Sequence, residues 1–416
     1  MSAGAPRLAA VDALSAQGGD ARGLVREHLR SEPRAFLEEL REHRPILVVP
    51  GLGVITRFRD VEEALLRARV FSVKAYAPRF KGVLGPFILS LDQTPAYDHD
   101  KAAMRLAMRR EDLGRAKAIA ASFAADAVRA AASPGRIFDI VQSLTRRTPV
   151  RLAADYFGVS APDDATMLAW ARALAWEAFE NVENDPEARG RAIGAAAAMS
   201  SRVREKIAAR RAGADSPDDL LGRLLAQQAA GPGFGFDDDG VVRTLMGLVA
   251  SMVESTSAAA VDAVLALAAD PAAWSGAVAA AEADADDLLW AHLQEALRFA
   301  SAGRTLTRVL NRDYLLGAGE AHETVLPKDL QVLVCTGSAM FDERIIQEPE
   351  AFRTDRPPEA YLHFSAGPHA CLGRYLSQVQ LTQMLKPLLR LKGLRIAAGP
   401  VHAGPFPDRL EVVSEA

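Results

Sequence analysis

A cysteine stands in a glycine-punctuated loop near the end of this chain, in the stretch HFSAGPHACLG at residues 363–373. An apolar helical pattern, RYLSQVQLTQMLKPLLRL, follows at once. The dipole and free N–H groups at the start of a helix stabilise a thiolate and lower its pKa. Gly367 and Gly373 let the backbone approach closely on either side of Cys371. Phe364 can shield the sulfur from water, so the loop has the features of a buried metal-thiolate.

The surroundings of this cysteine narrow the choice of metal. The chain has two cysteines, Cys335 and Cys371, and no other cysteine or histidine stands near Cys371 at the spacing of a zinc site. A single axial ligand to haem iron is therefore one interpretation of the loop. The other is a structural cysteine in a glycine-rich turn, and the loop alone does not decide between them.

A second group of polar residues interrupts a long apolar helical pattern at residues 238–270. The pattern is apolar on nearly all sides, which predicts a buried helix of about 45 Å. Glu254 and Ser255 stand in its middle. An alcohol can hold water and a neighbouring acid can relay protons, so this pair could serve proton delivery. The alternative for Ser255 and Thr256 is hydrogen bonding back to helix carbonyls.

A third group is charged. Glu295 and Arg298 in QEALRF share one helix face, although such pairs usually lie on solvated surfaces. Arg356 lies in DERIIQEPEAFRTDRP, immediately before the cysteine loop.

The elements that position these residues are mainly helical. Helical periodicity fills residues 98–230, while the stretches 45–58 and 304–335 indicate short strands. There is no internal repeat and no linker between two cores. We predict one mainly α domain with a minor β component over residues 23–416. The small polar residues of 1–22 predict a disordered lead.

Composition excludes several classes of protein. A net charge of −4 does not point to nucleic acid or to an anionic membrane surface. Two cysteines make no disulfide framework, and the N-terminus has no apolar run long enough for a signal peptide or membrane anchor. A cytoplasmic location is the expectation.

Together the three groups resemble one family. The pattern F-x-x-G-x-x-x-C-x-G at 364–373 resembles the haem-binding loop of the cytochrome P450 family. Glu295 and Arg298 resemble that family's paired charge motif, and Arg356 resembles its third partner. The motifs occur in the family's order and at its separations.

The resemblance extends over most of the chain. Residues 54–72 look like the family's N-terminal strand–helix passage, and residues 326–343 look like its strand and turn before the loop. It implies a single P450-like domain, mainly α with a minor β component, in which a long central helix and the cysteine loop enclose haem b.

The resemblance also implies roles for matching residues. Cys371 would be the thiolate ligand to haem iron, in a loop that includes Phe364 and Gly373. His369 and Arg308 would donate to haem propionates. Glu295, Arg298 and Arg356 would hold the fold around the haem without taking part in chemistry.

An early helix departs from the family pattern, which has a histidine or tryptophan and an arginine for a propionate. Aligning DQTPAYDHDKAAMR on Pro95 puts Tyr97 and Lys101 at these positions and keeps a hydroxyl donor and a cation. Aligning on His99 instead leaves Ala103 in place of the arginine. We prefer the first alignment, and His99 remains a second candidate or a solvated helix residue.

The central helix departs more. The family usually has a glycine two residues before the acid and a threonine after it, and the glycine permits a local widening for oxygen and water. Here Met252 replaces the glycine and Ser255 the threonine, whereas Glu254 keeps the acid.

These residues predict a haem-thiolate monooxygenase that oxidises an apolar small molecule with O2. Because the chain holds no flavin or ferredoxin module, its electrons would come from a separate ferredoxin or flavodoxin-type donor. Met252 and the atypical early helix favour the alternative, a haem-thiolate enzyme that uses peroxide or acts as an isomerase or dehydratase. A haem or ligand carrier is the third hypothesis. Apolar residues at 72–92, among them Phe80 and Phe87, predict an apolar substrate pocket.

Overall fold

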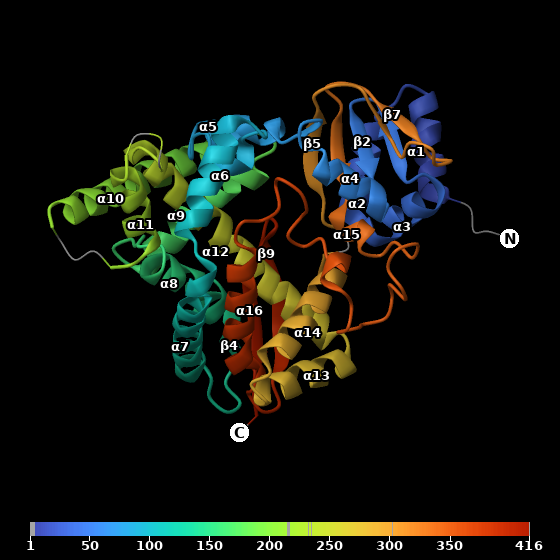
Figure 1. The fold of residues 1–416 in the computed structure, drawn as a ribbon. Coiled ribbons are helices and arrows are strands. Elements are labelled where there is room, and N and C mark those ends of the chain that lie inside the picture. Colours follow the sequence, from blue (N-terminus) through green and yellow to red (C-terminus); the bar gives the residue numbers. More distant parts are fainter. Residues whose placement is uncertain (1–4, 214–216, 232, 234, 302, 416) are drawn as a thin grey trace. The chain divides into compact units, whose positions relative to one another are not determined.

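The computed structural model describes residues 5–213, 217–231, 233, 235–301 and 303–415. The described chain divides into two compact units, each with its own apolar core (Figure 1). The first unit consists of Met1–Ala75 and Leu297–Cys371, and the second of Tyr76–Ala296 and Leu372–Ala416. The prediction of a mainly helical chain with small sheets is confirmed.

A five-stranded sheet lies in the first unit, with the strand order β1-β2-β8-β5-β3. β1 and β2 form a hairpin whose turn contains Gly51 at φ +74°, a conformation that favours glycine. β2 then pairs in parallel with β8. The predicted strand regions 45–58 and 304–335 supply most of these strands. The elements are α1 (Pro6–Ala16), α2 (Ala21–Ser31), α3 (Pro33–His43), β1 (Ile46–Val49), β2 (Leu52–Ile55), α4 (Phe58–Leu66), β3 (Phe71–Ser72), β5 (Leu306–Leu310), β6 (Tyr314–Leu316), β7 (Thr324–Leu326), β8 (Gln331–Val334), α15 (Thr336–Ala339) and η6 (Pro358–Ala360).

The N-terminal segment differs from its prediction. Where a disordered lead was expected over 1–22, helix α1 buries Leu8 and Val11 against the core of the first unit. The backbone N–H of Leu8 donates to Glu39 Oε1 at 2.7 Å. Two apolar contacts and one buried hydrogen bond therefore order a segment whose composition is mostly small and polar.

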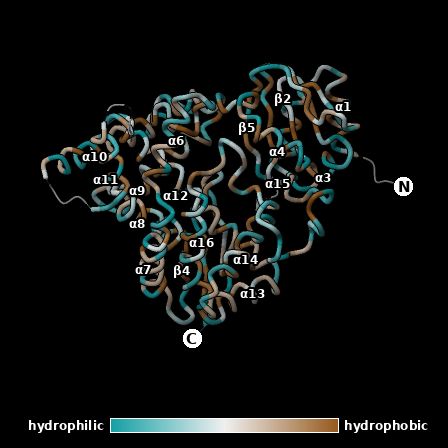
Figure 2. Tube along the Cα trace, viewed as in Figure 1, coloured by the Kyte–Doolittle hydropathy of each residue, from teal (hydrophilic) through white to brown (hydrophobic). Residues whose placement is uncertain are grey.

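The second unit is built around α12 (Asp238–Ala268), which packs against helices on several sides and is largely buried. Asp237 caps it by accepting from the Gly240 N–H at 2.7 Å, as the acidic run before it predicts. Most other helices are amphipathic, with hydrophobic and hydrophilic residues interleaved along the chain (Figure 2). The further elements are α5 (Ala77–Lys81), η2 (Ile88–Ser90), α6 (Pro95–Ala107), η3 (Arg110–Asp112), α7 (Leu113–Ala131), β4 (Phe138–Asp139), η4 (Val141–Thr145), α8 (Arg147–Asp155), α9 (Asp164–Ala175), η5 (Trp176–Glu180), α10 (Pro186–Arg211), α11 (Leu220–Ala229), α13 (Pro271–Glu282), α16 (Arg374–Leu389), β9 (Arg395–Ala403) and β10 (Phe406–Val413).

Two elements lie where the chain passes between the units. η1 (Lys74–Tyr76) and α14 (Asp286–Ala300) each contribute residues to both.

Among the described residues, α12 is the one helix long and apolar enough to cross a membrane. Its most apolar stretch is 61% buried inside the molecule, against α8, α9 and α10 among others. Burial of this kind is typical of a core helix.

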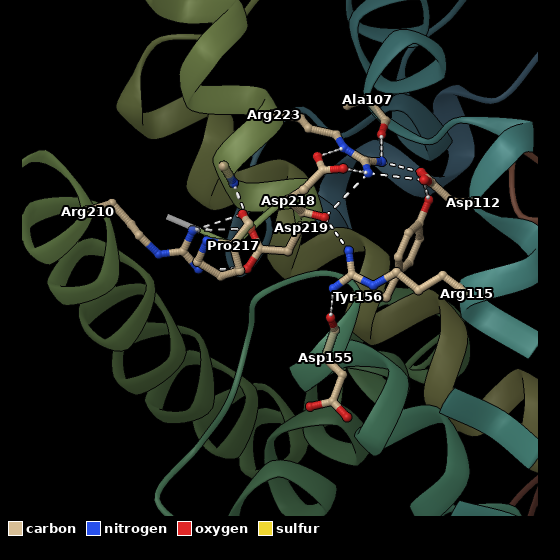
Figure 3. A network of polar contacts seen from close by, with 11 residues as sticks. Ala107, Asp112, Arg115, Asp155, Tyr156, Arg210, Pro217, Asp218, Asp219 and Arg223 are labelled. Atoms are coloured by element: carbon tan, nitrogen blue, oxygen red, sulfur yellow. Dashed lines mark hydrogen bonds and ion pairs between the residues drawn. The ribbon is translucent and has the colours of Figure 1, made fainter. Parts of the chain in front are cut away.

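A buried arginine of the second unit connects three helical elements (Figure 3). Arg223, on α11, donates to the Ala107 carbonyl at the end of α6 and to the carboxylate of Asp112 in η3, both at 3.1 Å. Its Nε also donates to Asp218 at 2.6 Å. Tyr156, which directly follows α8, donates from Oη to Asp112 at 3.1 Å. Asp112 therefore serves a buried cation and a largely buried phenol, while Asp218 is mostly exposed.

We expect Asp112→Asn to lower the free energy of unfolding by about 2–3 kcal/mol, because a nearly buried guanidinium loses one of its two carboxylates. Asp218→Asn is the matched control and should change it much less, since water can replace an exposed partner. Thermal and denaturant unfolding of the two variants would test this, and equal losses would contradict the assignment of Asp112 as the main anchor.

Candidate active site

The cysteine loop is held by backbone contacts within the first unit. The Cys371 N–H donates to the Phe364 carbonyl at 2.8 Å, and the Ala370 N–H donates to the Gly367 carbonyl at 3.1 Å. These bonds fold the chain back on itself just before α16. The side chain of Cys371 is exposed, so its thiol is accessible to a ligand.

Gly367 sits where no other residue would fit without strain. Its φ is +68°, and a Cβ atom would lie 2.7 Å from the Leu65 carbonyl oxygen and 3.1 Å from the Leu66 Cα. The loop thus rests against the end of α4, backbone to backbone. This contact supports the inference from sequence that a glycine at this position permits close approach.

Two arginines bind the segment that leads into the loop. Arg298 is fully buried, donates to the carbonyls of Met340 (3.0 Å) and Ala351 (3.3 Å), and packs 4.5 Å from the ring centre of Phe341. Arg356 donates to the same Ala351 carbonyl at 2.8 Å. The two arginines therefore converge on one backbone group, in the segment before the cysteine loop.

Two further predicted residues also lie in the first unit. Arg308 is buried on β5 and donates to the Thr307 carbonyl at 2.9 Å. His369 is partly buried in the cysteine loop, two residues before Cys371. Glu295, also predicted as scaffold, is fully buried on α14 in the second unit.

On α6, the structure brings Tyr97 and Lys101 together and places His99 elsewhere. Lys101 is buried, and its Nζ donates to Tyr97 Oη at 2.8 Å. Burial raises the pKa of Tyr97 to about 12. His99 is exposed, lies 3.2 Å from Asp100 Oδ1 and contacts Phe236. Tyr97 and Lys101, the residues selected by the alignment on Pro95, therefore adjoin, whereas His99 lies apart from them.

Glu254 is fully buried in the middle of α12, and two arginines hold its carboxylate. Arg146 donates from Nη2 to Oε1 at 2.8 Å, and Arg172 Nη2 lies 2.9 Å from Oε2. Arg146 connects η4 to α8, and Arg172 lies on α9. The two guanidiniums offset the cost of burying the negative charge.

Ser255 is exposed on a different face of α12. Its hydroxyl donates to the carbonyls of Ser251 and Met252, as the alternative interpretation of this serine anticipates. Met252 accepts a contact from Gln380 Nε2 on α16, at 3.3 Å from its sulfur. The helix continues through these residues without a break. Because consecutive helix residues point in different directions, Glu254 and Ser255 have separate surroundings.

Comparison with known proteins places this site in a family. Residues 281–391 match the family model described as Cytochrome P450. The chain is 27% identical to the steroid C26-monooxygenase of Mycobacterium tuberculosis (strain ATCC 25618 / H37Rv), over 91% of this chain and 92% of that protein. The fold is similar to the solved structure of cytochrome P450 TbtJ1, with a TM-score of 0.76, 25% identity, and coverage of 91% and 96%. The chain belongs to the cytochrome P450 family.

A second relative agrees with this assignment. The mycinamicin IV hydroxylase/epoxidase of Micromonospora griseorubida is 26% identical over 86% of this chain and 88% of that enzyme. The protein is thus a P450 monooxygenase with haem b as its cofactor.

The side chains of this P450 suit haem in each unit taken by itself. The first unit presents an exposed thiol in a loop shaped by backbone hydrogen bonds, together with the buried guanidinium of Arg308. The second presents the adjoining ammonium of Lys101 and phenol of Tyr97. A thiolate can ligate iron, and cationic and hydroxyl donors bind carboxylates such as the propionates of haem.

Sequence reasoning missed the two arginines that hold Glu254. A signal was available, because a carboxylate in an apolar helix needs cationic partners. Arg172 is an isolated cation within the apolar stretch MLAWARALAW. It was not connected to Glu254 because the two are far apart in sequence.

Phe80 and Phe87, predicted to line an apolar pocket, are buried in the apolar core of the second unit. Their rings stack with centroids 6.5 Å apart, and Phe80 also meets Phe179 edge-on. The predicted loop at 72–92 contains the short helices η1, α5 and η2.

The two cysteines should differ sharply toward alkylating agents. Complete burial raises the pKa of Cys335 to about 12, so its thiol stays neutral and unreactive at pH 8. We expect iodoacetamide to label Cys371 alone in the haem-free protein and neither cysteine once haem is bound, as measured by peptide mass spectrometry. Labelling of Cys371 in the haem-loaded protein would contradict its role as the ligand.

Proposed function

We propose that this P450 inserts one oxygen atom from O2 into an apolar small molecule, with Cys371 as the ligand to haem iron. The observation that carries the proposal is the exposed Cys371 thiol in a loop fixed by its own backbone bonds. Two relatives are named for a steroid and for mycinamicin, which supports a substrate with an extended apolar body. We also propose a cytoplasmic location.

The haem iron, with its thiolate ligand, would supply the activation of oxygen. Lys101, Tyr97, Arg308 and His369 would hold the propionates through charged and neutral hydrogen bonds. Phe364 and Gly373 would shape the loop around Cys371. His99 is left out of this set because its side chain is exposed and faces Asp100.

Cys371→His tests the ligand. Imidazole also binds haem iron, so the variant should keep the cofactor. It should lose the thiolate's influence on the absorption spectrum and at least about 10²-fold in oxygenation, since the thiolate favours O–O cleavage. Retention of wild-type spectra would overturn the assignment. Cys335→Ser, which removes the buried thiol of the other cysteine, is the control. It should change neither the absorption spectrum nor the rate of oxygenation.

Proton delivery would involve Glu254 and Ser255. A proton reaching the oxygen site needs a group that holds water and a group that exchanges protons. The exposed hydroxyl of Ser255 can hold water, and Glu254 can exchange protons if its carboxylate leaves one of its two arginines. Consecutive helix residues point about 100° apart, so water would have to join the two.

We expect Glu254→Gln to lower kcat about 10²-fold, because the amide keeps the shape but cannot relay a proton. The kinetic solvent isotope effect should rise, and binding of substrate should change little. Ser255→Thr restores the family's residue and should keep activity, whereas Ser255→Ala should release more peroxide per turnover. An unchanged isotope effect in Glu254→Gln would remove this residue from the relay.

A separate electron donor is part of the proposal. On the second unit, the exposed guanidiniums of Arg110 and Arg374 both lie over the ring of Tyr375, at 4.1 and 4.7 Å from its centre. Two clustered cations of this kind suit an acidic protein such as a ferredoxin or flavodoxin.

The alternative is a haem-thiolate enzyme that uses peroxide or rearranges an oxygenated substrate. Met252, in the place of the family's glycine and held by Gln380, favours it because the helix has no local widening. Turnover with hydrogen peroxide and no donor would support the alternative. Strict dependence of turnover on O2 and on an electron donor would support the monooxygenase, and so would a donor interaction that salt weakens.

A further inference from the structure

A cavity of about 490 Å³ opens beside Glu254 within the second unit. α9 contributes much of its lining, and η4, the η4–α8 junction, η5, α10 and the β9–β10 hairpin contribute the rest. The apolar part consists of Leu168, Trp176 and several alanines, among them Ala169, Ala173 and Ala188. Cavities of this size and character are typical of small-molecule sites.

Charged residues lie at two places in the lining. Arg146 and Arg172 line it on the side of α12, and the more exposed Arg191 lines it on α10. Asp408 is the acid among the described lining residues, 3.9 Å from Arg172 Nη1. The described lining thus carries three guanidiniums and one carboxylate. With Glu254 behind the lining and the exposed Glu187 at 3.8 Å from Arg191 Nη1, the three arginines face three carboxylates, two of which are exposed. A ligand carboxylate would compete with these exposed acids for the arginines.

The two inner arginines are held in place. Arg172 donates to the Pro407 carbonyl at 3.1 Å and packs 5.2 Å from the ring centre of Phe406. Arg146 uses Nε and Nη2 for Glu254 and also donates to the Leu168 carbonyl at 3.4 Å. Its Nη1 makes no hydrogen bond to another described residue, so a guanidinium fixed on one side retains donors on the other.

An aromatic wall is also fixed. Trp176 packs directly on Gly404 in the β9–β10 turn, where a Cβ atom would lie 2.4 Å from the indole. It meets Phe406 with ring centroids 6.0 Å apart. An indole seated in this way offers a rigid apolar surface to a ligand.

We propose that this cavity binds a small organic carboxylate with an apolar body. The carboxylate would bind Arg172, Arg146 and Arg191, and the apolar body would lie against Trp176 and the alanines. Because the ligand and Glu254 share two arginines, each weakens the other's hold on them, and the coupling is reciprocal. Binding of the carboxylate does not depend on the proposed chemistry. A change in turnover caused by the bound carboxylate would rest on the proposed function, in which Glu254 relays protons.

The test is calorimetric titration of the haem-loaded protein with 2-naphthoate and with uncharged 2-naphthamide. Imidazole bound to the haem iron keeps the titrant from binding the iron during the titration. We expect one naphthoate per chain and at least about tenfold weaker binding of the amide, because the amide lacks the charge-assisted hydrogen bonds. Equal affinity for the two compounds would overturn the proposal, as would full displacement of naphthoate by equimolar inorganic phosphate.

Variants locate the binding. Arg191→Gln should weaken naphthoate about fivefold through loss of one charge contact. Arg202→Gln, on the same helix but outside the lining, is the matched control and should have no effect. Unchanged binding in Arg191→Gln and Trp176→Ala would place the ligand elsewhere.

Glu254→Gln tests the coupling separately. It frees Arg146 and Arg172 from their internal carboxylate, so naphthoate should bind about tenfold more tightly. Unchanged affinity would show that the arginines are not shared. This result concerns binding alone, and it is therefore distinguishable from a failure of the relay.

Discussion

The burial of one negative charge organises the second unit. Glu254 lies inside a helix that is apolar on nearly every side, and its carboxylate cannot stay there without cations. Arg146 supplies one cation from the start of α8, and Arg172 supplies the other from α9. Each arginine also donates to a backbone carbonyl, that of Leu168 or Pro407. A single acid on α12 thus connects three helices and a strand.

The same constraint shapes the proposed chemistry. An apolar residue at this position would pack without the cost of desolvating three charged groups, so stability alone does not explain the acid. Ser255, one residue later, faces different surroundings because successive helix residues diverge. In this chain Met252 and the unbroken helix replace the widening that the family's glycine permits. Transfer between acid and alcohol would therefore depend on water moving around the helix.

Local patterns predicted the fold well. Two local patterns predicted elements correctly: the alternation at 45–58 predicted the first strands, and the long apolar run at 238–270 predicted the central helix. Both signals lie within one short segment of the sequence. The cysteine loop and the Glu295, Arg298 and Arg356 framework were assigned only through the resemblance to the family, because neither motif is decisive by itself.

What the sequence did not reveal depends on long-range contacts. Helix α1 was missed because long-range contacts stabilise it, among them the burial of Leu8 and Val11 and the hydrogen bond from the Leu8 N–H to Glu39. The partners of Glu254 come from segments more than 80 residues away, and no periodic signal spans such a separation.

The two halves of the proposed chemistry rest on separate cores. In the first unit, Arg298 and Arg356 converge on the Ala351 carbonyl, and Gly367 rests on the end of α4. A lysine could not replace Arg298, because the planar guanidinium both bonds two carbonyls and packs on aromatic rings. These contacts fix the loop that carries Cys371. The position of Glu254 depends on Arg146 and Arg172 of the second unit. A change in the first core should therefore disturb the Cys371 loop first, and a change in the second core should disturb proton delivery first.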